Sequence, residues 1–60
     1  MNLLNAHDFI LNITDRTKLS ITVEAHGCDN EISEIMDEAA RSGHSFSRKD
    51  IRHAINEIIN

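Results

Sequence analysis

Two segments in the second half of the chain carry apolar residues at helical spacing. The first has them at i, i+3, i+4, i+7 and i+8: Ile32, Ile35, Met36, Ala39 and Ala40. The second repeats that spacing: Ile51, Ala54, Ile55, Ile58 and Ile59. Such a stripe covers one face of a helix. Because a short segment from Gly43 to Ser47 separates the two stripes, the pattern predicts a helical hairpin at the C-terminal end of the chain.

Local signals in the connecting segment agree with this hairpin. Gly43 suits the left-handed position that ends a helix. Ser47 and Asp50 form the S-x-x-D variant of a capping box, which starts the next helix. Phe46 precedes this cap, and we expect it to pack on Ile51 as a hydrophobic staple.

The first helix of the hairpin has its own end signals. We expect it to begin after Cys28-Asp29-Asn30, where either Asx residue can serve as the cap. Acidic residues near this start favour the positive end of the helix dipole. Near the other end, Asp37 and Glu38 precede Arg41 by four and three residues, which is a favourable order for ion pairing.

The N-terminal half is predicted to contain one or two further helices. Phe9, Ile10 and Ile13 have helical spacing, so a first helix runs from about Asn2 or Asn5 to Ile13. Thr14, followed by Asp15 in the first turn, indicates the cap of a second helix. Gly27 is expected to end it.

The segment from Lys18 to Glu24 is ambiguous. Its alternating apolar residues and its β-branched content are typical of a strand. A single strand would have no partner in so short a chain, and Leu19 with Val23 also satisfies i, i+4. We therefore favour a helix and keep the strand as the alternative. The expected fold is all-α, a single domain (1–60) formed by a small bundle of three to four short helices.

Length and composition limit the classes of protein. The chain has 60 residues, one cysteine and a formal charge of −4. No internal disulfide can form, no apolar run is long enough to span a membrane, and no secretory signal is evident, so we expect a cytoplasmic protein. The three closest basic residues, Arg48, Lys49 and Arg52, enclose Asp50, which favours a solvated polar face over a nucleic-acid surface.

Candidate chemistry is sparse. His26, Cys28, His44 and His53 supply enough ligands for a zinc site, but their spacing is irregular and no paired ligand motif is present. A Cys28 nucleophile would need a base and an oxyanion hole in a cleft, and a chain of this length has little room for one. We predict exposed histidines, a buried or surface thiol at Cys28, no metal, no cofactor and no catalytic residue.

Two surfaces are candidates for partner binding. The acidic residues Glu31, Glu34, Asp37 and Glu38 form either a solvated helix face or an electrostatic docking strip. Ile55, Ile58 and Ile59 crowd the last six residues. They either close the core against Phe9, Ile13 and Phe46, or form a partner groove or a self-association seam.

The order of several segments resembles a known family. These segments are Ala6-His7-Asp8-Phe9-Ile10, then Asp15 with Leu19, then Glu31-Ile32, and finally the run from Ala39 to Ile51. That run has the form A-x-x-x-G-x-x-F-S-x-x-[DE]-[LI]. In this order the chain is similar, from about Met1 to Ile55, to the nitrogen-fixation-associated (Nif-eleven-like) leader domain family. Its members are small helical domains that act as leaders of ribosomally made, post-translationally modified peptides or occur as free-standing proteins.

The resemblance implies a recognition domain without catalysis. A peptide-modifying enzyme, or its peptide-recognition domain, would hold the leader while it works on a core peptide. No double-glycine cleavage site is present, so the chain is either a leader whose core lies outside these residues or a free-standing member. In the first case Leu19, Ile21 and Val23 would add to a sheet edge of the partner. In the second, a regulatory or assembly protein would form a homodimer through the Ile51 to Ile59 face. A helix-turn-helix DNA binder is disfavoured by charge.

Overall fold

The residues that the computed structural model describes, 3–60, fold into four helices and no strand. They are α1 (Ala6–Ile13), α2 (Arg16–His26), α3 (Cys28–Arg41) and α4 (Arg48–Ile59). The predicted all-α bundle and its C-terminal helical hairpin are confirmed. The radius of gyration, 10.5 Å, matches the value of about 10 Å that is typical of a folded chain of this length.

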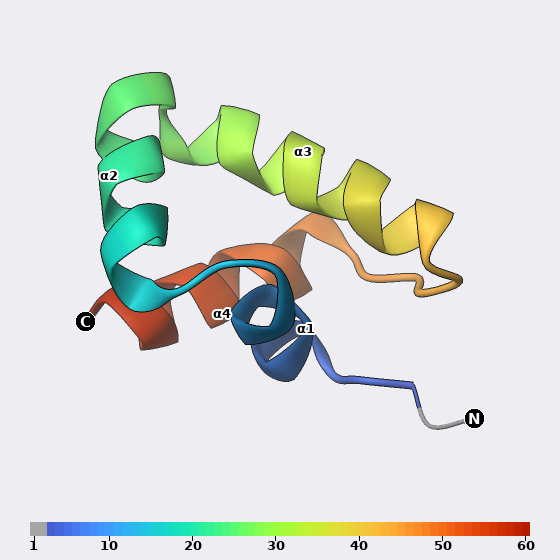
Figure 1. Cartoon of the computed structure of the whole chain (residues 1–60). Helices are drawn as coiled ribbons and strands as arrows, with labels where there is room; N and C mark the ends of the chain where they lie inside the picture. Colours follow the sequence, from blue (N-terminus) through green and yellow to red (C-terminus); the bar gives the residue numbers. More distant parts are fainter. Residues whose placement is uncertain (1–2) are drawn as a thin grey trace.

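Helix α4 is the central element of the bundle. It packs against each of the other three helices, and α2 also packs against α3. In Figure 1, α3 lies along the top, α4 returns beneath it, and α2 stands across the left-hand end of both. At that end the Arg16 side chain donates a hydrogen bond to the backbone carbonyl of Ile59, at 3.4 Å.

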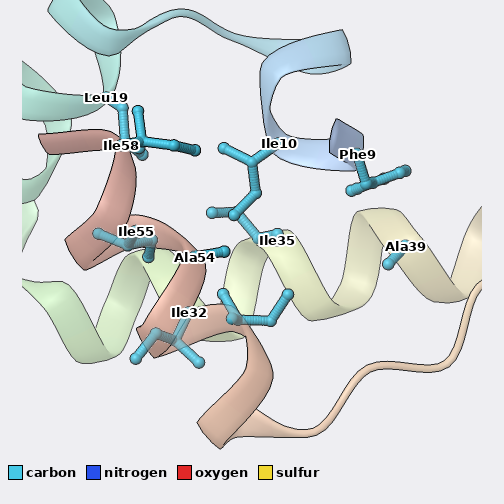
Figure 2. Packing of buried hydrophobic residues seen from close by; sticks show 10 residues of the cluster. Phe9, Ile10, Leu19, Ile32, Ile35, Ala39, Ala54, Ile55 and Ile58 are labelled. Atoms are coloured by element: carbon cyan, nitrogen blue, oxygen red, sulfur yellow. The ribbon is translucent and has the colours of Figure 1, made fainter. Parts of the chain in front are cut away.

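All four helices contribute side chains to one hydrophobic core. Its buried members are Phe9, Ile10, Leu19, Ile32, Ile35, Ala39, Ile51, Ala54, Ile55 and Ile58. Figure 2 shows Phe9 and Ala39 at one end of this cluster and Leu19 with Ile58 at the other. Helices α3 and α4 carry the two stripes predicted from the sequence, and α4 contributes four of the buried residues.

The ambiguous segment is helical, as favoured, and the strand alternative is wrong. Leu19 is 1% exposed, whereas Ile21 is 61% exposed, so alternate residues do not share one face. The hydroxyl of Thr22 donates to the carbonyls of Lys18 and Leu19, at 3.0 and 3.1 Å. Its β-branched side chain is thus accommodated within the helical pattern of hydrogen bonds.

The turn between α3 and α4 has the predicted end signals. Gly43 has a φ of +79°, and the N–H groups of Gly43 and His44 donate to the carbonyls of Ala40 and Ala39. These two bonds complete a Schellman motif. The capping box of Ser47 and Asp50 is formed in both directions, at 3.1 and 3.2 Å.

The caps of the earlier helices correct several predictions. Asn5 caps α1, which settles the choice between Asn2 and Asn5. Asp15 caps α2 through a 2.9 Å bond from the Lys18 N–H, so the prediction of Thr14 as the cap was wrong. Thr14 instead ends α1 in an extended conformation.

The predicted start of α3 was also wrong. Helix α3 begins at Cys28, directly after Gly27, and has no side-chain cap. Gly27 ends α2 as expected, with φ +91° and ψ 148°, and this one residue turns the chain from α2 into α3 (Figure 1). Asn30 does not cap its own helix, because its amide donates to the His26 carbonyl at the end of α2.

Candidate functional site

A groove opens where the end of α1 and the face of α2 meet α3. Its volume is about 200 Å³. Three side chains form its apolar part, namely Ile13, Leu19 and Ile35. Two hydroxyls and three carboxylates complete the lining: Thr14, Thr22, Glu31, Glu34 and Glu38. The groove therefore combines an aliphatic surface with carboxylates of α3.

Helical spacing and the turn between α2 and α3 place these side chains together. On α3, Glu31, Ile35 and Glu38 stand at i, i+4 and i+7, so they project from one face. On α2, Leu19 and Thr22 are three residues apart and face the same groove. The turn at Gly27 sets α2 across the end of α3, so a face of each helix lines the groove (Figure 1).

Ile13 takes a different position from the one expected. The sequence suggested that it would close the core with Phe9, but it is 41% exposed at the groove. Ile10 occupies the interior instead and is fully buried. The reason is that α1 ends at Ile13, so the following extended residue, Thr14, leads the chain away from the core.

Glu31 is the unusual residue of the groove. It is the one charged residue buried among residues 3–60, with 7% exposure. Its carboxylate forms no hydrogen bond or ion pair within that described range, and its oxygens still reach solvent through the groove, because His44 Nδ1 is the one fully buried side-chain nitrogen or oxygen of residues 3–60 without a partner. It lies in the first turn of α3, where the positive end of the helix dipole favours a negative charge. The helix supports this charge, but no cationic side chain of the described chain neutralises it.

The four other acidic residues of α3, Asp29, Glu34, Asp37 and Glu38, are exposed. Glu38 pairs with Arg41 at 3.2 Å, as predicted, while the predicted Asp37–Arg41 pair is absent from the described ion pairs. Glu34, Asp37, Glu38 and Arg41 also line a shallow, mostly polar depression beside the groove. Glu34 and Glu38 thus border both hollows, which makes the predicted acidic strip continuous with the groove.

The structure separates the apolar residues that the sequence suggested for partner binding. Leu19, Ile55 and Ile58 lie in the core, at 1%, 1% and 8% exposure. Val23 and Ile59 are partly buried and pack against that core. Of this group, Ile21 alone is well exposed. Core closure therefore accounts for Ile55 and Ile58, and a partner could reach these two side chains only if the bundle opened.

An aromatic cluster places His44 inside the structure, which the prediction of exposed histidines missed. The His44 ring lies 5.0 Å from Phe9 and 5.5 Å from Phe46, measured between ring centroids. Its Nε2 accepts a 3.1 Å hydrogen bond from the Leu4 N–H, so the proton of the neutral ring lies on Nδ1. The aromatic spacing of His44 and Phe46 was the signal that could have revealed this contact.

The potential ligands in the sequence do not converge. Within residues 3–60, no three side chains among His, Cys, Asp and Glu are placed to hold a metal ion. Cys28 is half-buried against the core. Its position at the start of α3 gives it a packing role.

The two arginines of α4 make their contacts within the chain. Arg48 and Arg52 approach the Asp29 carboxylate at 3.8 and 3.9 Å. Arg48 also donates to the Ser33 hydroxyl at 3.0 Å and to the Asp29 carbonyl at 3.4 Å. These contacts join α4 to the start of α3. The sequence did not reveal Asp29 as the common partner of the two arginines.

Comparisons with known proteins add no assignment. Searches against protein families, curated proteins and solved structures found no match for this chain. Among residues 3–60, every helix is too short or too polar to cross a bilayer.

Proposed function

We propose that this chain is a non-catalytic recognition domain that docks a ribosomally made precursor peptide onto the enzyme that modifies it. The observation that carries the proposal is the groove between α2 and α3, where Glu31, 7% exposed and without a partner in the described chain, lies beside the exposed Ile13 and two exposed acidic side chains. Its occupant would be the modifying enzyme or the peptide-recognition domain of that enzyme.

The distribution of side chains supports a binding role. The aliphatic stripes of α3 and α4 are used in the core, while the acidic face of α3 stays exposed. Charged residues of one sign around a groove select a partner of the opposite sign and speed its association. The sequence resemblance to the Nif-eleven-like leaders supplies the class of partner.

A free-standing assembly protein would need a surface for self-association other than the predicted face of α4. Its proposed seam, the face of α4 that includes Ile51 and Ile55, is covered by the other helices of the same chain. Self-association through this face would compete with folding of the monomer. The groove between α2 and α3 remains accessible in the folded chain, so it favours the recognition role.

The test compares modification of one core peptide in two forms. In the first form the peptide is fused after Asn60, and in the second the same peptide is mixed with the separate domain. The cognate enzyme is expected to bind the domain in a calorimetric titration and to modify the fused core faster, because tethering raises the effective concentration of the core. Absence of both binding and acceleration would overturn the proposed function.

A further inference from the structure

We propose that the groove between α2 and α3 receives a lysine or arginine side chain from a basic segment of the partner protein. The aliphatic stem of that side chain would lie along the exposed Ile13, above Leu19 and Ile35, which close the floor of the groove at 1% and 5% exposure. Its cation would pair with the Glu31 carboxylate. The identity of the partner rests on the proposed function, whereas the chemistry of the groove does not.

The size and lining of the groove fit one long cationic side chain. Its volume of about 200 Å³ lies below the range of about 300–1,000 Å³ typical of pockets for drug-sized ligands. Lysine and arginine carry an apolar stem with a charged head. An aliphatic wall with a carboxylate matches both parts, while a purely apolar side chain would leave Glu31 desolvated and unpaired.

Charge complementarity selects a cation. Glu31 lacks an ion-pair partner within residues 3–60, and Glu34 and Glu38 add negative charge to the edge of the same groove. Nearby cations are engaged: Arg41 pairs with Glu38, while Arg48 and Arg52 approach Asp29. The planar guanidinium can bind a carboxylate through two hydrogen bonds, so arginine is favoured over lysine.

The Glu31 side chain makes no polar contact that holds the fold together. Its carboxylate has no hydrogen bond or ion pair within residues 3–60. Glutamine has nearly the same shape without the charge. We therefore expect Glu31→Gln to change the melting temperature little, because it loses only a favourable interaction with the helix dipole, and at the same time to weaken cation binding. If Glu31 only supported the fold, its replacement would lower the melting temperature and cation binding together.

The probe is the acetylated and amidated pentapeptide Ala-Leu-Arg-Leu-Ala, titrated into the whole chain and followed by NMR. Its matched control has citrulline in place of arginine, which preserves the shape and removes the charge. Binding should shift the methyl signals of Ile13, Leu19 and Ile35. We expect at least about tenfold weaker binding for the citrulline peptide and for Glu31→Gln, equivalent to about 1.4 kcal/mol.

Two further variants keep this test decisive. Ile13→Ala removes an exposed part of the apolar wall and should weaken the arginine peptide in a domain that still folds. Glu57→Gln removes one exposed charge of α4 outside the groove and should bind like the native chain. Equal weakening by Glu31→Gln and Glu57→Gln would indicate general charge attraction and overturn the proposal. So would undiminished binding to Glu31→Gln, or the absence of binding to the native chain.

The same variants separate this inference from the proposed function. If the modifying enzyme binds native and Glu31→Gln chains equally, the function stands and the assignment of the groove is wrong. If the arginine peptide enters the groove but the enzyme does not bind the chain, the groove assignment stands and the proposed function is wrong.

Discussion

The two halves of this bundle are held in different ways. Helices α3 and α4 each bury four residues, and a Schellman motif and a capping box join them. Helix α2 has eleven residues and buries Leu19 alone. Its other links to the bundle are partial contacts such as those of Val23. The C-terminal hairpin is thus fixed by packing and local signals together, whereas α2 depends on a single buried side chain.

This difference bears on where binding can occur. Segments with few buried contacts open at a lower free energy than the rest of a protein, and binding surfaces are often drawn from them. The groove has one wall on the firmly packed α3 and the other on α2. A partner side chain that contacts both walls would therefore stabilise α2. The difference in stability between α2 and the hairpin can be measured by unfolding and by hydrogen exchange.

Replacing Ile51 should have the largest effect on stability. Ile51 is 0% exposed and lies in α4, which contacts every other helix. Ile51→Ala should lower the free energy of unfolding by about 2–5 kcal/mol, a large share of what a domain of this size possesses. Urea unfolding followed by circular dichroism measures this loss. A loss below about 1 kcal/mol, the range of mild core changes, would contradict the central role of α4.

Replacing Leu19 tests the other half. Leu19→Ala removes the one fully buried side chain of α2, so we expect a loss of about 2 kcal/mol, at the lower end for such a change. Hydrogen exchange should show lost protection from Arg16 to His26 while the amides of α3 and α4 stay protected. Equal loss of protection in all four helices would show that the bundle unfolds as one unit and would remove the distinction between its halves.

Alanine at the two glycines should cost different amounts of stability. Gly27, between α2 and α3, has φ +91° and ψ 148°, in a region adopted almost solely by glycine. Gly43 has φ +79°, and a Cβ at either position would meet nothing within 4 Å. The effect of alanine is therefore conformational: about 1–3 kcal/mol at Gly27 and about 1 kcal/mol at Gly43.

Thermal unfolding of the two alanine variants measures this difference. Gly43→Asn serves as the control and should remain near native stability, because asparagine tolerates the left-handed conformation. If Gly43→Ala lowered the melting temperature more than Gly27→Ala, the turn between α2 and α3 would need glycine less than the turn between α3 and α4 does.

The sequence predicted the hairpin well because independent signals coincide there. The two apolar stripes, Gly43 and the Ser47–Asp50 box all point to the same turn. At the start of α3 the signals conflict, since both Asp29 and Asn30 are good caps. The conformation of Gly27 decided the outcome, because Gly27 itself takes the N-cap position and α3 begins at Cys28, before either Asx residue can act as a cap.

The groove was beyond sequence reasoning for a different reason. Glu31, Glu34 and Glu38 were recognised as an acidic face, but a groove exists only once α2 lies against that face. Glu31 and Glu34 have the same type of side chain and similar neighbours in sequence. Their different burial follows from the position of α2, and no helical periodicity specifies how two helices cross.

The smallest expected effect concerns the exposed link between α3 and α4. Arg48→Gln removes an ion pair to Asp29 and a hydrogen bond to Ser33, both at the surface, so we expect a loss of about 0.5 kcal/mol. The control, Lys49→Gln, changes the net charge equally at an exposed residue without a described ion pair. The difference in urea midpoint between the two variants should shrink in 1 M salt, because screening weakens exposed pairs. A difference that persists in salt would mean that Arg48 joins the helices through its neutral contacts to Ser33 and the Asp29 carbonyl, so that shape rather than charge fixes the outer side of the hairpin.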